Sequence, residues 1–238
     1  MKDLPPIETH LKDGLFEGKT ALVTGGGTGL GQEISRRLAA LGARVVIASR
    51  STEHHAPLLA EASEQGWRVE AEVLDVRSMA GVADCAARVH ERLGADGGRS
   101  ALDILVNNAA GNFVCPAERL TERAWRAVLG IVLDGTFYCS KAFGRQMIAD
   151  GGGSMLNVVA TYAWTGMPGV VHSASAKAGV LAMSKTLAAE WARHKIRVNA
   201  IAPGPFESEG AGANLWPDDA SRKKIEDGIP LGRFGTAE

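Results

Sequence analysis

The sequence predicts an α/β protein in which helices cover both faces of a parallel, doubly wound β-sheet. Short apolar runs rich in β-branched residues alternate with longer stretches that have helical periodicity. Such alternation is typical of parallel strands joined by right-handed crossovers. The 238 residues, 45% of them hydrophobic, are enough for one large core. We therefore expect a single domain.

Six runs have the length and composition of buried strands. They are Thr20–Thr24, Arg44–Ser49, Val69–Leu74, Asp103–Val106, Ser154–Val159 and Ile196–Ile201. The intervening stretches predict helices near Gly29–Leu41, His54–Gly66, Met79–Leu93, Thr121–Ala149 and Val171–Arg193. Glycine marks loops at Gly94–Gly98 and Gly151–Gly153, and Pro203–Asp219 has no strong period. Because ligands of such sheets bind at the carboxyl ends of the strands, the residues that follow each strand are the functional candidates.

Composition argues against several classes of function. The formal net charge of −1, without a run of Lys and Arg, gives no sign of binding to nucleic acid or to a membrane. Cys85, Cys115 and Cys139 are scattered and lack the spacing of metal ligands, which indicates reduced thiols and no metal site. Residues 1–18 resemble neither a signal peptide nor a transit peptide. We expect a cytoplasmic protein with an extension at 1–18 and one domain at 19–238.

A glycine-rich loop follows the first predicted strand and leads directly into a helix. Glycines let the backbone approach a pyrophosphate, whose charge is met by N–H groups at the helix N-terminus. The preceding strand, the following helix and their spacing distinguish this loop from an ordinary glycine turn. We therefore predict a dinucleotide-binding Rossmann fold. The loop residues expected to contact the cofactor are Thr24, Gly25, Gly27, Thr28, Gly29 and Leu30.

The end of the second strand indicates which dinucleotide is bound. Enzymes that use NAD place an acidic residue about 20 residues beyond the loop, where it binds the ribose hydroxyls. This chain has Ser49 and Arg50 there. Arg50 can bind a 2′-phosphate with two hydrogen bonds and Ser49 can add a hydroxyl, so we expect NADP(H), unless Arg50 is only a solvated surface residue. Asp75, which precedes Val76, either accepts a hydrogen bond from the adenine amino group or caps the next turn.

Several motifs together resemble the short-chain dehydrogenase/reductase family. They are the glycine loop, Asn107-Asn108-Ala109-Ala110-Gly111 after the fourth strand, Lys177 in the helix after the fifth, and Pro203-Gly204 after the sixth. The resemblance covers nearly the whole chain. It implies an NAD(P)-binding Rossmann domain, a homotetramer, and an active-site set of Ser, Tyr, Lys and Asn. It also implies a further helix and a seventh strand beyond Glu238, without which the sheet has a bare edge and the oligomer loses contacts.

This sequence departs from the family's active-site set at three of four positions. Lys177 is present, but Ala160 stands in place of the serine, Ser173 in place of the tyrosine and Val132 in place of the asparagine. The tyrosine normally exchanges a proton with the oxygen of an alcohol or carbonyl. A serine hydroxyl is far too weak an acid for that role, so an ordinary carbonyl reductase is not the first expectation.

Three further segments resemble one branch of the family. Ala109-Ala110-Gly111-Asn112-Phe113, Thr161-Tyr162-Ala163 and Ser173-Ala174-Ser175-Ala176-Lys177-Ala178-Gly179 are similar to segments of mitochondrial-type 2,4-dienoyl-CoA reductases. This resemblance implies NADPH-dependent reduction of 2,4-dienoyl-CoA thioesters to 3-enoyl-CoA in unsaturated fatty acid β-oxidation. It also implies that a tyrosine upstream of the lysine, with an asparagine after the fourth strand, performs the catalysis. Tyr162 and Asn112 occupy those positions.

The reaction that the resemblance implies requires stabilisation of an oxyanion. Hydride transfer to the distal carbon of a dienoyl thioester moves negative charge to the thioester oxygen, where Tyr162 and Asn112 can donate hydrogen bonds. A neutral phenol can also protonate the substrate. We expect Lys177 to hold the nicotinamide ribose, with Ser173 in the same network. The alternatives are packing for Tyr162, a turn for Asn112 and a helix start for Ser173.

The remaining candidates lie in neighbouring loops. The expected cofactor contacts there are Val76, Asn108, Ala109, Pro203, Gly204, Pro205 and Phe206, and the expected substrate contacts are Asn112, Phe113, Tyr162 and Arg77. A substrate flap is expected at about 203–220, with Glu207–Pro217 moving over the acyl chain. Arg77 is assigned to a CoA phosphate from its position after Asp75. The resembled branch often has an arginine in the flap where this chain has Asn214, which puts its CoA affinity in doubt.

Two other functions stay open. One is NADPH-dependent reduction of a 2-enoyl-CoA, a 3-oxoacyl group or another carbonyl. The other is a non-catalytic protein that binds NADP as a scaffold or sensor. Ser173, Ala160 and Val132 argue against the carbonyl reductase, whereas Tyr162 and Asn112 argue against the non-catalytic protein.

Overall fold

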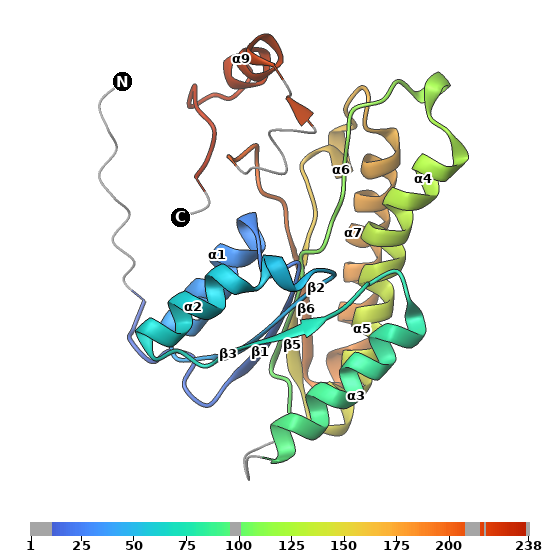
Figure 1. Ribbon diagram of the computed structural model, residues 1–238. Coiled ribbons are helices and arrows are strands. Elements are labelled where there is room, and N and C mark those ends of the chain that lie inside the picture. Colours follow the sequence, from blue (N-terminus) through green and yellow to red (C-terminus); the bar gives the residue numbers. More distant parts are fainter. Residues whose placement is uncertain (1–10, 96–100, 208–214, 217, 237–238) are drawn as a thin grey trace.

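The computed structural model contains a six-stranded parallel sheet with the strand order β3-β2-β1-β4-β5-β6 (Figure 1). Residues 11–95, 101–207, 215–216 and 218–236 are described. The strands are β1 (Thr20–Thr24), β2 (Arg44–Ser49), β3 (Val69–Val73), β4 (Ile104–Asn107), β5 (Gly153–Val158) and β6 (Ile196–Ile201). This strand order is that of the Rossmann fold, in which two halves meet beside β1. The prediction of a doubly wound parallel sheet is confirmed.

The predicted strands β4 and β5 lie one residue away from their observed positions. Asp103, predicted to begin β4, uses its carboxylate instead, which accepts a hydrogen bond from the Thr20 backbone at 3.0 Å. The ladder between β1 and β4 runs from Ala21 opposite Ile104 to Thr24 opposite Asn107. The Asp103 backbone also bonds both neighbouring strands, donating to the Thr20 carbonyl and accepting from the Ser154 N–H, so the boundaries differ by one residue while the strands are the predicted ones.

Helices lie on both faces of the sheet (Figure 1). The helices α1 (Gly29–Ala40) and α2 (Ala56–Gln65) pack on β1, β2 and β3 from one side. On the other side, α5 (Gly135–Ala149) packs on β4 and β5, and α7 (Val171–Trp191) packs on β5 and β6. The helix α3 (Met79–Ala95) packs against α5.

The long helix predicted over Thr121–Ala149 is divided in the structure. It consists of α4 (Glu122–Leu129), a π-helical turn η3 (Gly130–Asp134) and α5. The Thr121 hydroxyl caps α4 by accepting from the Ala124 N–H at 3.2 Å. In the turn, the Thr136 hydroxyl donates to the Val132 carbonyl at 2.7 Å. The extra residue of a π turn breaks the helical register, which apolar periodicity could not reveal.

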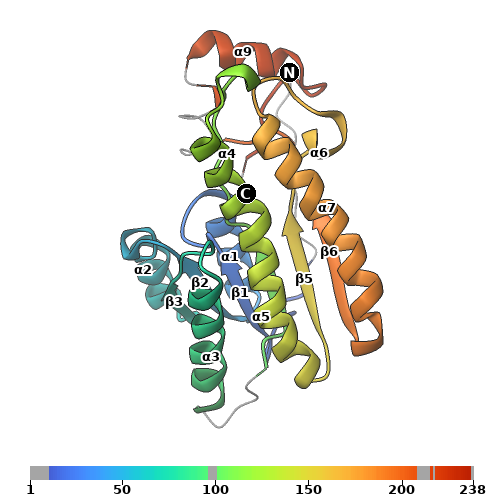
Figure 2. The same ribbon diagram turned by 90° about the vertical axis from the view of Figure 1, so that its right-hand side faces the viewer.

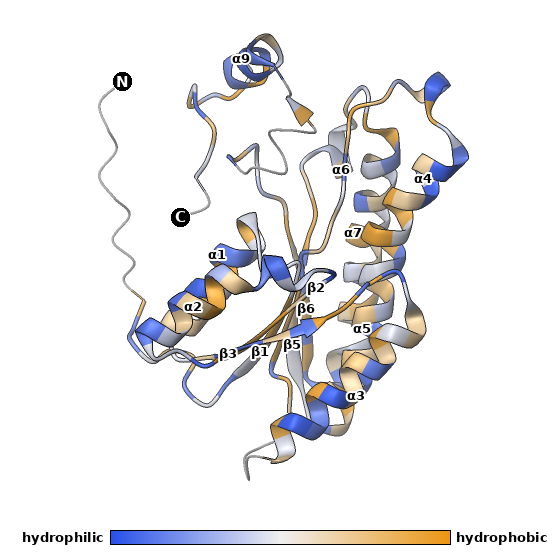
Figure 3. Ribbon diagram, in the orientation of Figure 1, coloured by the Kyte–Doolittle hydropathy of each residue, from blue (hydrophilic) through white to orange (hydrophobic). Residues whose placement is uncertain are grey.

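The core lies in two layers because successive strand residues point to opposite faces of the sheet. Leu22 faces a cluster with Phe143 and Met147 of α5, whereas Val23 faces a cluster with Leu58 of α2. All five side chains are fully buried. Figure 3 shows hydrophobic segments along the strands and α7, while α9 (Asp219–Asp227) is mainly hydrophilic.

Buried polar side chains join the layers between the two halves of the sheet. Asn107 Nδ2 donates to Asn157 Oδ1 at 2.8 Å and to Ser140 Oγ at 3.1 Å. Asn157 Nδ2 in turn donates to Ser184 Oγ at 2.8 Å. These bonds connect β4 and β5 with α5 and α7. This network holds the strand ends in one relative position, which matters because the loops beyond them carry the candidate site.

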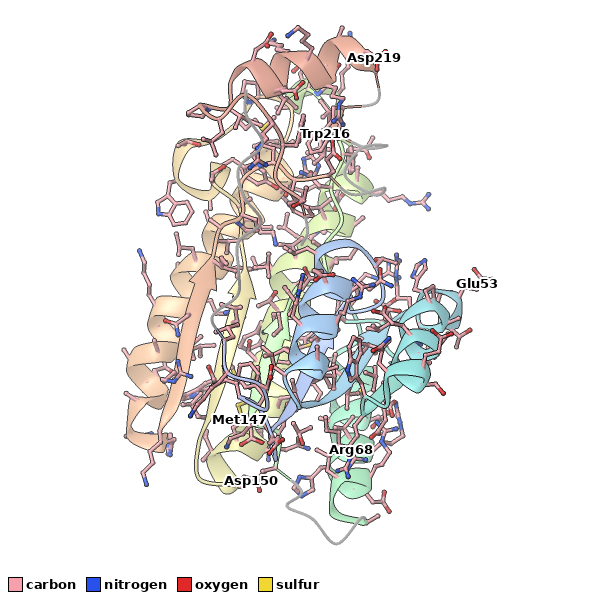
Figure 4. All side chains as sticks on the ribbon, turned by 90° about the vertical axis from the view of Figure 1, so that its left-hand side faces the viewer. Glu53, Arg68, Met147, Asp150, Trp216 and Asp219 are labelled. Atoms are coloured by element: carbon pink, nitrogen blue, oxygen red, sulfur yellow. The ribbon has the colours of Figure 1, made fainter. Side chains whose placement is uncertain are left out.

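The strands point toward one end of the molecule, where α4, α6 (Tyr162–Thr165) and α9 lie beyond the tip of β5 (Figure 2). Figure 4 places Trp216 and Asp219 at this end, opposite Met147 and Asp150. The helix α9 was not predicted, although Asp218 caps it in the ordinary way, accepting from the Ser221 N–H at 2.8 Å. Beyond α9 the chain returns, and Phe206 pairs with Gly235 in a short parallel bridge.

Candidate active site

The glycine loop and the start of α1 form an anion site by their backbone. Thr28 precedes α1, but its side chain makes no capping hydrogen bond, and no acidic residue lies in the first turn. Thr28 and Gly29 are both exposed. A helix N-terminus that is neither capped by a side chain nor neutralised by a carboxylate favours an anionic ligand. The loop therefore fits the pyrophosphate of a dinucleotide.

Thr24 and Asn108 hold the glycine loop to the loop that follows β4. The Thr24 hydroxyl oxygen accepts from the backbone N–H groups of Asn108 and Ala109, each at 3.0 Å. Asn108 Nδ2 donates to the carbonyls of Thr24 and Gly25 at 3.1 and 3.2 Å. The side chains of Thr24 and Asn108, both predicted to contact the cofactor, thus shape the loop itself. A Cβ at Gly31 would overlap with the Gly25 carbonyl and the Asn108 amide.

At the end of β2, Ser49 is held by a buried histidine. Ser49 Oγ lies 2.7 Å from His55 Nε2 and donates to the Ser51 carbonyl at 3.1 Å. His55 is only 2% exposed, and burial, aided by the neighbouring His54, lowers its pKa. Because the Ser49 hydrogen points to Ser51, His55 must donate to the Ser49 oxygen. Arg50, which follows, is exposed, as a 2′-phosphate ligand needs to be.

Asp75 and Arg77, which were predicted to bind different ligands, form an ion pair. The Asp75 carboxylate accepts from Arg77 Nε at 2.9 Å and from the Arg77 backbone N–H at 3.0 Å. Hydrogen bonding to the Arg77 side chain is the main reason that the pKa of Asp75 is lowered. Val76 is buried against Gly135, so only its backbone can face a ligand. An adenine amino group that bound Asp75, or a CoA phosphate that bound Arg77, would therefore have to compete with the hydrogen bonds of this ion pair.

Three predicted catalytic side chains meet at the carboxyl end of β5. Tyr162, the first residue of α6, places its hydroxyl oxygen 3.0 Å from Ser173 Oγ on α7. Asn112, in the loop after β4, donates from Nδ2 to the same phenol oxygen at 3.3 Å. Ser173 is 1% exposed, whereas Tyr162 and Asn112 are half-buried. The cluster is thus open on the side of Tyr162 and closed behind it by Ser173.

Lys177 lies one turn further along α7 and is almost completely buried. Its ammonium donates to the Val158 carbonyl at the end of β5. Burial lowers the pKa of Lys177 to about 8. The residue is only 6% exposed, so its ammonium is shielded from bulk water. The Val158 carbonyl is its one hydrogen-bond partner among the described residues, which leaves donors for ribose hydroxyls.

Phe113 and His172 form a wall beside this cluster. Their ring centroids are 4.4 Å apart and tilted by 36°. The Phe113 N–H donates to the Asn112 side-chain oxygen at 2.9 Å, which orients the Asn112 amide toward Tyr162. Phe113 also contacts a small buried cluster that includes Val132 and Val180. The predicted substrate residue Phe113 therefore joins the catalytic loop to the core.

The two other departures from the family's active-site set lie near this cluster. Val132 is 1% exposed in the π turn and has no polar side chain to offer, although its carbonyl accepts from Thr136. Ala160 begins the turn into α6, where its carbonyl accepts from the Ala163 N–H at 2.9 Å. Neither position supplies a hydroxyl or an amide. The polar groups of the cluster come from Tyr162, Asn112 and Ser173 instead.

The predicted flap is described only at its two ends. Most of Glu207–Pro217, including Asn214, lies outside the described residues. Of the nicotinamide-side residues, Pro203 and Phe206 are half-buried and Gly204 and Pro205 are exposed. The backbone on both sides of Phe206 pairs with Gly235. The Glu207 N–H donates to the Gly235 carbonyl, and the Gly235 N–H donates to the Pro205 carbonyl, both at 2.9 Å.

Sequence reasoning missed three residues that support the site. His172, which was not among the predicted site residues, packs on Phe113 in the loop after β4. His55, also not among them, is buried against Ser49. Phe234, 4% exposed, packs against Trp216 with centroids 5.0 Å apart. Each depends on contacts between distant segments, for which no local motif exists.

Within the described residues, no group of three or more His, Cys, Asp or Glu side chains could hold a metal ion. No helix in that part of the chain has both the length and the apolar character needed to cross a bilayer. The polar groups of the site are thus hydroxyls, amides and ammonium or guanidinium groups.

Comparison with known proteins identifies the family. Residues 19–217 match the short chain dehydrogenase family. A probable 2,4-dienoyl-CoA reductase ((2E)-enoyl-CoA-producing) of Bacillus subtilis is 42% identical over 229 residues, which are 94% of this chain and 86% of that protein. A galactitol 2-dehydrogenase of Rhizobium johnstonii is 38% identical over 230 residues, or 94% of this chain and 85% of that protein.

A solved structure has the same fold. The gluconate 5-dehydrogenase of Burkholderia cenocepacia, crystallised in complex with NADP and tartrate, superposes with a TM-score of 0.84 at 34% identity. The match covers 93% of this chain and 84% of that one. Together with the glycine loop and the buried lysine, these matches show that the chain belongs to the short-chain dehydrogenase family of oxidoreductases, which bind a nicotinamide cofactor.

Proposed function

We propose that the protein reduces 2,4-dienoyl-CoA thioesters to 3-enoyl-CoA with NADPH. The observation that carries the proposal is the meeting of Tyr162, Asn112 and Ser173 around one phenol oxygen. A phenol and an amide that converge on one point suit a developing oxyanion better than a single proton donor does. The printed name of the Bacillus subtilis relative supports the same substrate class.

Bound NADPH would supply the hydride, which adds to the distal carbon of the diene. The electron pair then moves through the conjugated system to the thioester oxygen. Tyr162 and Asn112 are proposed to donate hydrogen bonds to that oxygen, because the Asn112 amide lies 3.3 Å from the Tyr162 hydroxyl and one oxygen can reach both donors. Tyr162 next gives its proton to the α-carbon, which leaves the double bond between C3 and C4. Solvent returns a proton to the phenolate.

Ser173 and Lys177 act on Tyr162 and the cofactor rather than on the substrate. Ser173 supplies a hydrogen bond to the phenol oxygen that remains when the phenol has lost its proton. The buried Lys177 ammonium is proposed to bind the nicotinamide ribose, because among the described residues the Val158 carbonyl occupies one of its three N–H donors. Val76, Asn108, Ala109 and the 203–206 segment complete the nicotinamide side of the proposed site.

NADP(H) is proposed as the cofactor because of Arg50. Its exposed guanidinium follows Ser49 at the end of β2, and no acidic residue takes the place that NAD enzymes use. The NADP complex of the Burkholderia cenocepacia structure supports this choice within the family. Asp75 is proposed to accept from the adenine amino group and Arg77 to meet a CoA phosphate. We also propose a cytoplasmic homotetramer, as the family resemblance implies.

A second candidate function is the oxidation of an alcohol or the reduction of a carbonyl. The similarity to galactitol 2-dehydrogenase favours it. The Tyr162 hydroxyl also favours it, because it lies next to the Ser173 position, where the family's own proton donor belongs. The dienoyl reaction is preferred because Asn112 adds a second donor that a simple alcohol does not require.

The experiment that tests the proposal compares substrates and products. NADPH oxidation is measured with 2,4-hexadienoyl-CoA, crotonyl-CoA and acetoacetyl-CoA. NADP reduction is measured with galactitol. Consumption of NADPH with the dienoyl thioester and formation of 3-hexenoyl-CoA are expected. A 2-hexenoyl product, as the Bacillus subtilis name describes, would move protonation from the α-carbon to C4. Turnover of galactitol or acetoacetyl-CoA without turnover of the diene would refute the proposal.

A further inference from the structure

His172 is a buried histidine without a polar partner. It is fully buried as the second residue of α7, and neither of its ring nitrogens has a hydrogen-bond partner among the residues that the structure describes. Unpaired polar groups are rare in protein interiors because burying them costs free energy. Phenylalanine would fill the same space without this cost. Packing alone therefore does not explain why this residue is a histidine.

Contacts connect His172 with the proposed catalytic residues on two sides. Its ring lies against the ring of Phe113, with centroids 4.4 Å apart. The Phe113 N–H holds the Asn112 oxygen at 2.9 Å, and the Asn112 amide donates to Tyr162 at 3.3 Å. Tyr162 closes the circuit at Ser173, 3.0 Å away and next to His172 in the chain. A displacement of His172 would therefore be transmitted to Asn112 by two routes. One route runs through Phe113, and the other runs through Ser173 and Tyr162.

A second contact holds the same loop at its far side. The Cys115 N–H donates to the Gly169 carbonyl at 2.8 Å, so residues 113–115 lie between Gly169 and His172. Gly169 has a φ of +79°, and a Cβ there would press on Val114. Among the described residues, a backbone hydrogen bond thus holds the loop that carries Asn112 at Cys115, while at Phe113 the loop packs on the His172 ring and on the cluster that includes Val132.

The Phe113 backbone is a polar group that acts on the imidazole. Burial lowers the pKa of His172, and the Phe113 carbonyl acts in the opposite direction, as an acceptor facing an N–H does. Their geometry falls short of a hydrogen bond in the free protein. Hydrogen bonds of catalytic sites are often long before substrate binds and shorten in the complex.

We propose that His172 is a positioning residue, whose imidazole N–H binds the Phe113 carbonyl when substrate enters and so fixes the Asn112 amide against the oxyanion. This inference deepens the proposed function and rests on it, because Asn112 must act on the substrate. The imidazole acts in its neutral form, since its burial disfavours the charged ring. It does not touch the substrate.

Two variants separate the hydrogen bond from the packing. His172→Phe keeps a ring against Phe113 but removes the N–H, and kcat for the dienoyl thioester is expected to fall by roughly tenfold with KM within about twofold. His172→Gln restores an amide donor, and most of the lost kcat is expected to return. His90→Phe is the control, because His90 lies half-buried on α3 and its Nδ1 also lacks a partner among the described residues. That control should match the wild type.

A double-mutant cycle shows whether His172 acts through Asn112. In an Asn112→Ala background, His172→Phe should lower kcat no further, because its target is already absent. The crystal structure of His172→Phe with a bound dienoyl thioester should show the Asn112 amide outside hydrogen-bond range of the thioester oxygen, whereas in the wild-type complex it should lie within range. Additive losses, or a His172→Phe variant with wild-type kcat, would overturn the proposal.

The outcome is separable from that of the proposed function. If the wild-type enzyme ignores the diene but turns over a carbonyl or alcohol, the proposed function fails, and the same cycle is run with that substrate. Loss of kcat in His172→Phe that disappears in the Asn112→Ala background would then still support the positioning role. Additive losses of kcat from the two substitutions would reject the positioning role for either substrate.

Discussion

The hydroxyl oxygen of Tyr162 lies 3.0 Å from Ser173 Oγ, although the two residues belong to different helices. Ser173 occupies the position at which the family places its proton-donating tyrosine. The phenol has therefore not been lost from this region. It reaches the same neighbourhood from α6 instead of α7, and a serine fills the space behind it.

Replacing Tyr162 should abolish most of the activity without unfolding the protein. Tyr162→Phe keeps the ring but removes the donor, so kcat is expected to fall by roughly 10²–10³, the usual cost of losing one oxyanion donor. Tyr138→Phe is the control, because Tyr138 is the second of the two tyrosines and lies on α5. Initial rates of NADPH oxidation and the thermal midpoint are measured for each. Wild-type activity in Tyr162→Phe would remove the phenol from the mechanism.

Replacing Arg50 should change the choice of cofactor. Charge-assisted hydrogen bonds are worth about 1.5–3 kcal/mol, which corresponds to about 10–100-fold in affinity. KM for NADPH is therefore expected to rise by that factor in Arg50→Ala, while KM for NADH stays unchanged. Arg145→Ala, at an exposed position on α5, is the matched control. A parallel rise for NADH would show that Arg50 does not bind the 2′-phosphate.

Gly31 has no room for a side chain. A Cβ there would overlap with the Gly25 carbonyl and the Asn108 amide, which together connect the glycine loop to the loop after β4. We expect Gly31→Ala to weaken NADPH binding by at least about tenfold and to lower the free energy of unfolding. At Gly130, the nearest atom to an added Cβ is 3.8 Å away, so Gly130→Ala should affect neither. Fluorescence titration with NADPH and urea unfolding provide the measurements.

Stability should fall as the pH falls below neutrality because of His172. Burial lowers its pKa from the ordinary 6.5, so the unfolded chain binds this proton at a pH where the folded chain does not. Proton binding therefore stabilises the unfolded state as the pH drops, and the contribution of His172 to stability is complete only above about pH 6.5. His55, whose pKa is also lowered, acts in the same direction.

Urea unfolding at about pH 7.5 and pH 5.5 tests this expectation. The free energy of unfolding should be lower at the acidic pH, and the difference should shrink in His172→Phe, which has no proton to bind. An equal pH dependence in the variant and the wild type would mean that other groups cause it.

Local residue patterns were sufficient to predict the sheet and the glycine loop that follows β1, whereas the catalytic roles of the site residues stay predictions. Alternation of apolar runs and helical stretches predicted six parallel strands, because that pattern records burial on two faces. The glycines after β1 predicted the anion site, because only glycine permits the close backbone approach. Tyr162, Asn112 and Ser173 were identified by resemblance, and the structure brings all three within hydrogen-bond distance.

Contacts between distant segments had to be seen in the folded chain. No local motif predicts three of these contacts. They are the ion pair of Asp75 with Arg77, the burial of His55 against Ser49 and the packing of His172 on Phe113. The π turn before α5 and the helix α9 were likewise absent from the predictions. Periodicity and spacing report how one segment is buried, whereas the partner of a side chain depends on which other segment reaches it.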